Sequence, residues 1–139
     1  MKIRQGMMML GLLPALVFQA YAEQAGFVLN AEWTAGQENP AVVISMSISK
    51  GYFLYADQFR VTDGAGRELE ASGPLPIHEK KDPFSGAPVQ VLSESFQARY
   101  PLPDDAEGSG DVTVAYQGCN ESTCFMPQRR TFHFSSGHE

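Results

Sequence analysis

The most constraining feature of this 139-residue chain is an apolar side chain at every second position over several short segments. Segments 27–33 and 42–48 both alternate in this way, and serines occupy intervening positions of the second. A period of two is typical of a β-strand with one buried face, whereas the longer period of an amphipathic helix is almost absent. The pattern therefore predicts antiparallel strands.

Short strands separated by turns are expected along the rest of the chain. The expected strands are 27–33, 42–48, 52–55, 59–61, 69–71, 89–102 with a bulge near 92–95, 111–116 and 125–134. Segment 74–88 is rich in proline and charge and is expected to be a long irregular loop. So many short strands in a chain of single-domain length favour an all-β antiparallel β-sandwich.

The start of the chain has the order of a secretory signal peptide. Lys2 and Arg4 precede an uncharged run rich in Met and Leu, and the tripeptide 20–22 (Ala-Tyr-Ala) supplies a cleavage site. The apolar run is shorter than the ~20 residues that span a bilayer. We therefore expect residues 1–22 to be removed and residues 23–139 to form one exported, soluble domain.

The charge balance bears on the class of partner. The formal net charge is −6, and the cations do not gather into a stripe. Binding to a phosphate backbone needs clustered Lys and Arg, so a nucleic-acid partner is not expected. His78, the pair Lys80–Lys81 and His133 are expected to be solvated.

The chain contains two cysteines, Cys119 and Cys124, in a C-x4-C spacing. In an exported protein they can form a disulfide, here near the facing ends of the last two expected strands. A bond that closes so short a loop stabilises the fold by only about 2 kcal/mol. Two interpretations stay open from the residues alone: an exchange-active pair, or a structural bond in an immunoglobulin-like binding module.

Metal and haem sites are poorly supported by the motifs around the cysteines. The pair is not a C-x-x-C or C-x-x-C-H motif, and its spacing to the histidines matches no common zinc pattern. Met126 lies near Cys124, as in a blue-copper sandwich, but the histidine that should follow the cysteine is lacking. No metal and no other cofactor is expected.

Three segments resemble a known family. They are 114–119 (Val-Ala-Tyr-Gln-Gly-Cys) with Cys124 and Pro127 following, 51–55 (Gly-Tyr-Phe-Leu-Tyr) continuing to 58–61, and 82–86 (Asp-Pro-Phe-Ser-Gly). Together they resemble the N-terminal periplasmic domain of DsbD, a transmembrane thiol:disulfide interchange reductase. The likeness runs from about residue 27 to residue 134. It implies an immunoglobulin-like β-sandwich with an active-site hairpin and a cap loop.

The resemblance also assigns roles to individual residues. Cys124 would exchange with partners through a mixed disulfide, and Cys119 would resolve it. Phe84 would cap the disulfide and shield it from adventitious thiols. Asp82 and the ring of Tyr55 would lie around the sulfurs, and a carboxylate there would raise a thiol's pKa and slow unwanted exchange.

Three departures from the family pattern concern the same site. Phe53 replaces a tyrosine, Pro83 stands where an acidic residue is common, and the loop 120–123 is one residue shorter. The shorter loop is expected to affect the reduction potential of the pair.

The resemblance further implies the partners. They are thioredoxin-like proteins of the periplasm, among them disulfide isomerases and cytochrome c maturation thioredoxins. The membrane and C-terminal thioredoxin-like domains of DsbD have no counterpart in this sequence, so electrons are expected from a membrane-linked donor protein in trans. The expected activity is that of a protein-disulfide reductase.

Overall fold

The computed structural model describes residues 19–34, 40–103 and 110–134. Within these residues the chain forms strands and one short 3₁₀ helix, with no α-helix. The elements are β1 (Gln19–Gln24), β2 (Phe27–Thr34), β3 (Ala41–Ile48), β4 (Tyr52–Tyr55), η1 (Ala56–Gln58), β5 (Arg60–Asp63), β6 (Ile77–Lys81), β7 (Pro88–Leu92), β8 (Phe96–Pro101), β9 (Gly110–Tyr116), β10 (Gly118–Asn120) and β11 (Gln128–Phe134).

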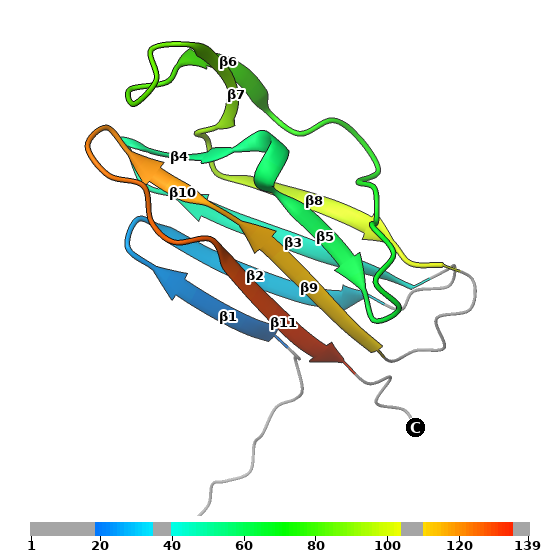
Figure 1. Cartoon of the computed structure of the whole chain (residues 1–139). Helices are drawn as coiled ribbons and strands as arrows, with labels where there is room; N and C mark the ends of the chain where they lie inside the picture. Colours follow the sequence, from blue (N-terminus) through cyan, green and yellow to red (C-terminus); the bar gives the residue numbers. More distant parts are fainter. Residues whose placement is uncertain (1–18, 35–39, 104–109, 135–139) are drawn as a thin grey trace, which may run out of the picture.

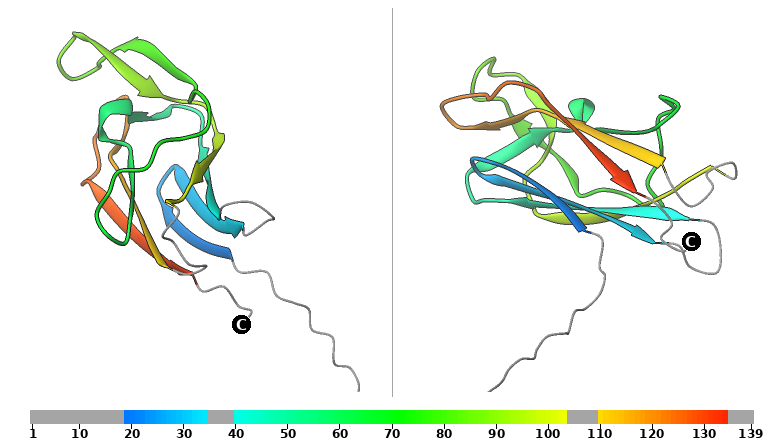
Figure 2. Two further views of the ribbon diagram at one scale, coloured as in Figure 1. Left: turned by 90° about the vertical axis from the view of Figure 1, so that its right-hand side faces the viewer. Right: turned by 90° about the horizontal axis from the view of Figure 1, so that it is seen from below.

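Two antiparallel sheets face each other and form a sandwich (Figures 1 and 2). One has the strand order β1-β2-β3-β8 and the other β11-β9-β5. Their inward side chains come from the alternating positions of the sequence and make one continuous core, which includes Leu29, Ile44, Val114 and Phe132. The predicted immunoglobulin-like antiparallel β-sandwich is confirmed. The alternating pattern could predict it because burial of one face fixes the register of each strand.

A third sheet, of order β10-β4-β7-β6, lies at one end of the sandwich (Figure 1) and carries Cys119 in β10. Strand β4 follows β3 after a tight turn, and β10 follows β9 after the single residue Gln117. The backbone N–H of Tyr55 donates to the carbonyl of Gln117 at 3.3 Å. The two strands that hold the site are thus direct extensions of core strands.

The prediction of a long irregular loop over 74–88 is wrong. Most of this segment belongs to a β-hairpin, in which β6 pairs with β7 from Ile77↔Leu92 to Lys81↔Pro88. Strand β6 is exposed at nearly every position, so it lacks the apolar alternation that marks a half-buried strand. We call residues 77–92 the cap hairpin.

Three smaller expectations are also corrected. Segment 69–71 is not a strand, although Leu69 is buried and its N–H donates to the carbonyl of Val61. No bulge interrupts 89–102: the chain leaves β7 in one sheet and enters β8 in another. The last strand begins at Gln128, and the preceding turn region contains β10, which is too short to show alternation.

The described part of the N-terminus bears on the expected boundary after Ala22. Strand β1 crosses this boundary, with Ala22 opposite Leu29 and Glu23 opposite Val28 of β2. Residues 1–18, which hold the rest of the expected signal peptide, lie outside the described residues, as do most of the loop 103–110 and the tail 135–139. Among the described residues, no helix is long and apolar enough to cross a membrane.

Candidate functional site: a disulfide at the end of the sandwich

Cys119 and Cys124 form a disulfide and face each other as an isolated antiparallel bridge, with their Cα atoms 4.0 Å apart. Cys119 lies in β10 opposite Phe53 of β4 and is fully buried, whereas Cys124 is partly exposed. Exchange requires a thiolate to approach a sulfur along the S–S axis. Of the two sulfurs, that of Cys124 is therefore the accessible one.

A small apolar cluster, separate from the main core, surrounds this bond. Its buried members are Phe53, Val91 and Cys119, and the side chains packed against them are Tyr55, Val89 and Cys124. The structure thus brings together four of the predicted site residues, Cys119, Cys124, Phe53 and Tyr55. The ring of Phe53 meets that of Tyr55 edge to face, with centroids 5.6 Å apart.

The residues before Cys119 explain why the cysteines take this position. Tyr116 is buried in the main core, and the side-chain amide of Gln117 donates to the carbonyl of Phe125 at 3.2 Å. Gly118 lies against the ring of Phe27, which a Cβ atom at this position would strike. In the Tyr-Gln-Gly-Cys run, Tyr116 is held in the core, Gln117 is bonded to the segment after the cysteines, and Gly118 allows the close approach to Phe27 that places Cys119.

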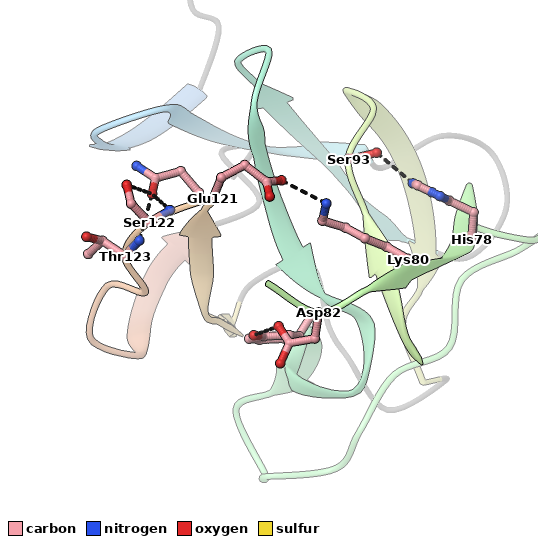
Figure 3. A network of polar contacts seen from close by, with 9 residues as sticks. His78, Lys80, Asp82, Ser93, Glu121, Ser122 and Thr123 are labelled. Carbon is pink, nitrogen blue, oxygen red and sulfur yellow. Dashed lines mark hydrogen bonds and ion pairs between the residues drawn. The ribbon is translucent and has the colours of Figure 1, made fainter. Parts of the chain in front are cut away.

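The four residues between the cysteines form a closed turn. The Oδ1 atom of Asn120 accepts hydrogen bonds from the N–H groups of Ser122 and Thr123 at 2.9 and 2.8 Å, and the N–H of Asn120 donates to the carbonyl of Thr123. Figure 3 shows this turn beside the sheet that carries Cys119. The side-chain amide oxygen replaces backbone partners, which lets so short a loop close.

A phenol links the accessible sulfur to a carboxylate. The Oη atom of Tyr55 donates to Oδ1 of Asp82 at 2.7 Å and lies 3.7 Å from Sγ of Cys124. Asp82 is buried, and its Oδ2 accepts from both the N–H and the hydroxyl of Ser85. Asp82 thus reaches the site through Tyr55, and the predicted neighbourhood of these residues is present in the structure.

The electrostatics of this contact favour a neutral phenol and a charged carboxyl. Burial, followed by the hydrogen bond and charge of Asp82 and the charge of Asp57, raises the pKa of Tyr55 to about 12. The hydrogen bond from Tyr55, together with those from Ser85, holds the pKa of Asp82 below its ordinary value against the opposing effect of desolvation. At neutral pH, Tyr55 is therefore a proton donor to an ionised Asp82.

Phe84 is the predicted site residue that the structure does not bring to the disulfide cluster. It lies in the turn of the cap hairpin with a relative exposure of 47%, next to exposed Pro83. The turn itself is held by Asp82, whose N–H donates to the carbonyl of Ala87 and whose carbonyl accepts from the N–H of Gly86. Phe84 is therefore a solvent-facing aromatic on a well-bonded turn.

One charged pair at the site joins residues far apart in the sequence. Lys80 was expected to be solvated, but its Nζ lies 2.8 Å from Oε2 of Glu121, a residue of the loop between the two cysteines. The same Nζ lies 5.1 Å from the centroid of the Phe53 ring. Lys80 and Glu121 are 41 positions apart, so no local pattern could pair them. His78 and His133 are exposed as expected.

The described residues contain no group of three or more His, Cys, Asp or Glu side chains that could hold a metal ion. Met126, considered above as a copper ligand, is 76% exposed.

Comparisons with known proteins agree with this geometry. The sequence model of the family described as "Thiol:disulfide interchange protein DsbD, N-terminal" matches residues 19–136. The chain is 31% identical over 116 residues to the thiol:disulfide interchange protein DsbD of Pasteurella multocida, covering 83% of the chain and 19% of that protein. It is 31% identical over 97 residues to DsbD of Escherichia coli K12, covering 66% of the chain and 16% of that protein. The chain thus spans about a fifth or less of these relatives.

Solved structures show the same fold. The N-terminal domain of Neisseria meningitidis DsbD in the reduced form superposes with a TM-score of 0.60 at 23% identity, covering 80% of this chain and 86% of that one. The same domain in its complex with the N-terminal domain of PilB superposes with a TM-score of 0.54 at 21% identity, covering 74% and 79%. With the family match over most of its length, the chain belongs to the family of DsbD N-terminal domains.

Proposed function

We propose that this domain is a protein-disulfide reductase that relays electrons by thiol:disulfide exchange through Cys119 and Cys124. The observation that carries the proposal is the asymmetric burial of the pair, with Cys119 enclosed against Phe53 and Cys124 partly exposed beside Tyr55. A structural bond has no need of one accessible sulfur. A shuttle needs it, because a partner must reach one sulfur while the other waits as leaving group and resolver.

The exchange proceeds in two balanced steps. In the reduced domain, the Cys124 thiolate attacks one sulfur of a partner's disulfide, which forms a mixed disulfide and releases the partner's other sulfur as a thiolate. The Cys119 thiolate then attacks Sγ of Cys124, which re-forms the Cys119–Cys124 bond and frees the reduced partner. Two electrons pass to the partner, and a donor dithiol restores them by the reverse sequence.

Tyr55, Asp82 and Phe84 control the reactivity of the pair in this proposal. The phenol oxygen beside Cys124 can accept a hydrogen bond from the thiol, since its own proton is donated to Asp82. The charge of Asp82 disfavours the thiolate and slows exchange with unselected thiols. Phe84, at the tip of the cap hairpin, shields the disulfide when the hairpin folds over it and gives way to a docking partner.

The partners in this proposal are thioredoxin-like proteins. The related domain of Neisseria meningitidis DsbD forms a complex with the N-terminal domain of PilB, which supports a protein as the exchanging partner here. We infer that oxidised periplasmic thioredoxin-fold proteins, including disulfide isomerases and cytochrome c maturation thioredoxins, accept the electrons. A membrane-linked thioredoxin-like protein supplies them in trans.

The proposal places the domain in the periplasm, where disulfide exchange partners are found. Export requires the N-terminal segment to act as a signal peptide, with cleavage between Ala22 and Glu23. The mature protein would then keep Glu23 and Gln24 of β1 opposite β2. The intact mass of protein isolated from the periplasm should correspond to a chain that begins at Glu23, and a mass that retains the first 22 residues would contradict cleavage.

Mixed-disulfide trapping tests the exchange function. A Cys119→Ser variant should hold a thioredoxin-like partner covalently through Cys124, because the resolving thiol is gone. The matched Cys124→Ser variant should trap nothing, since the remaining sulfur is buried. Non-reducing gels and peptide mass spectrometry identify the linked cysteine. Trapping through Cys119 alone, or by neither variant, would overturn the assignment.

The reduction potential of the pair separates exchange from a purely structural bond. Structural disulfides of exported proteins lie below about −300 mV, whereas exchange proteins lie at roughly −120 to −270 mV. Equilibration with thiol buffers, alkylation and mass measurement give the value. A potential in the higher range is expected, and one far below it would support the immunoglobulin-like binding module with a structural disulfide.

A further inference from the structure

The cap hairpin has few backbone connections to the rest of the domain. Strand β6 is the edge of its sheet and pairs with β7, and β7 pairs with β4 at two positions, Leu54↔Leu92 and Tyr55↔Val91. The outer half of the hairpin, which carries Asp82 and Phe84, lies beyond these pairs. Its position therefore depends on side-chain contacts.

Two alternate residues of the hairpin point toward the site and make those contacts. Asp82 accepts the hydrogen bond from Tyr55 described above. Lys80, two residues earlier and hence on the same face, extends from β6 to Glu121 in the turn between the cysteines (Figure 3). One contact holds the hairpin to β4, and the other holds it to the cysteine turn.

The contact of Lys80 is more than a surface ion pair. Its side chain is 25% exposed, its Nζ lies 2.8 Å from Oε2 of Glu121, and the same ammonium stands over the ring of Phe53 at 5.1 Å. Phe53 is buried and lies opposite Cys119. The aromatic face and the carboxylate thus bind one cation together, and partial burial reduces screening by solvent.

Resting on the proposed exchange function, we propose that Lys80 is a positioning residue for the cysteine pair. By binding Glu121 and the Phe53 ring, it holds the cap hairpin against the cysteine turn, so that Tyr55 and Asp82 remain at Cys124. Loss of this contact frees the hairpin and opens Cys124 to unselected thiols. The role differs from that of Asp82, because Lys80 acts through the turn and not on the sulfur.

The test measures how fast dithiothreitol reduces the oxidised full chain. In this reaction one dithiothreitol becomes a cyclic disulfide, and its two electrons convert the Cys119–Cys124 bond into two thiols. Lys80→Met keeps an unbranched side chain only one atom shorter and removes the charge, whereas Glu121→Gln removes the charge of the other partner at an exposed position. Lys80→Met should speed reduction by about five-fold, because it removes both the ion pair and the cation–π contact. Glu121→Gln should speed it by about two-fold, because the ammonium keeps its place over the Phe53 ring.

Several comparisons distinguish a tether from other effects of charge. Steering of the anionic thiolate by charge would slow reduction of Lys80→Met and speed that of Glu121→Gln. Loss of the contact that holds the hairpin speeds reduction of both variants. The double variant should then be no faster than Lys80→Met, because Glu121 acts only through Lys80. Lys80→Arg, which keeps the positive charge, should be reduced as slowly as the original chain. Lys81→Met is the matched control, since Lys81 is the exposed neighbour with the same charge and should leave the rate unchanged.

Added salt gives an independent readout. It should speed reduction of the original chain more than that of Lys80→Met, because salt screens the anionic thiolate in both but weakens an ion pair that the variant lacks. Equal rates for Lys80→Met and Lys81→Met, or opposite changes for the two single variants, would overturn the tether. No protein partner takes part in this assay, so its failure leaves the trapping result of Cys119→Ser untouched.

Discussion

Replacing Phe53 by alanine should lower the free energy of unfolding by about 3–5 kcal/mol, the usual loss for a buried aromatic ring. Phe53 is 1% exposed, contacts Tyr55 edge to face and lies opposite Cys119. Its removal leaves a cavity under the disulfide and takes away the ring beneath Lys80. Urea denaturation of the oxidised protein, monitored by far-UV circular dichroism, measures the loss.

Phe84→Ala is the matched control, with the same change of side chain at an exposed position. Its free energy of unfolding should remain within about 0.5 kcal/mol of the original value. If Phe84 shields the disulfide as proposed, this variant should nevertheless be reduced faster by dithiothreitol. Equal losses of stability for the two alanine variants would contradict the assignment of Phe53 to the interior and Phe84 to the surface.

Replacing Asp82 by asparagine should lower the pKa of the Cys124 thiol in the reduced protein by roughly one unit, which is about a tenfold gain in thiolate near neutral pH. The substitution removes the negative charge of Asp82, which is linked to Cys124 by the phenol of Tyr55, so the thiolate is no longer disfavoured. The pH dependence of alkylation of Cys124 gives the pKa directly. An unchanged or higher thiol pKa would show that Asp82 does not act on the sulfur.

Asp82 also makes stability depend on pH, with a definite sign. Its pKa is lower in the folded protein than in the unfolded chain, chiefly because Tyr55 donates to it. Such a carboxyl stabilises the fold fully above its unfolded pKa of about 4 and loses this contribution as pH falls through the folded pKa. The stability difference between the original chain and Asp82→Asn should therefore be constant near neutral pH and shrink in acid.

Tyr55→Phe provides the control for this effect. It keeps the ring in the cluster and removes the hydroxyl that lowers the pKa of Asp82. The pH dependence that Asp82 contributes should become smaller in this variant. If the stability of Tyr55→Phe still falls in acid as steeply as that of the original chain, the contact between Tyr55 and Asp82 is not the source.

The alternating segments predicted most of the fold because their pattern is local. Strands β2, β3 and β9 each bury one face against the main core, so their sequences carry the period of two along their whole length. Strands β6 and β10 were not predicted, for two different reasons. The first is charged and solvent-exposed, and the second is three residues long.

The reactive residues and the sandwich that carries them are visible in the sequence, because two cysteines five positions apart, an aromatic strand and an Asp-Pro-Phe turn occur in an order that resembles one family. The assembled sheets bury Cys119 and leave Cys124 partly exposed, bring Asp82 to the phenol of Tyr55, and bring Lys80 to Glu121. These contacts join residues that are 27 and 41 positions apart along the chain. Burial and pairing depend on strands that meet only when three sheets assemble, and no local pattern records which distant side chain will lie opposite.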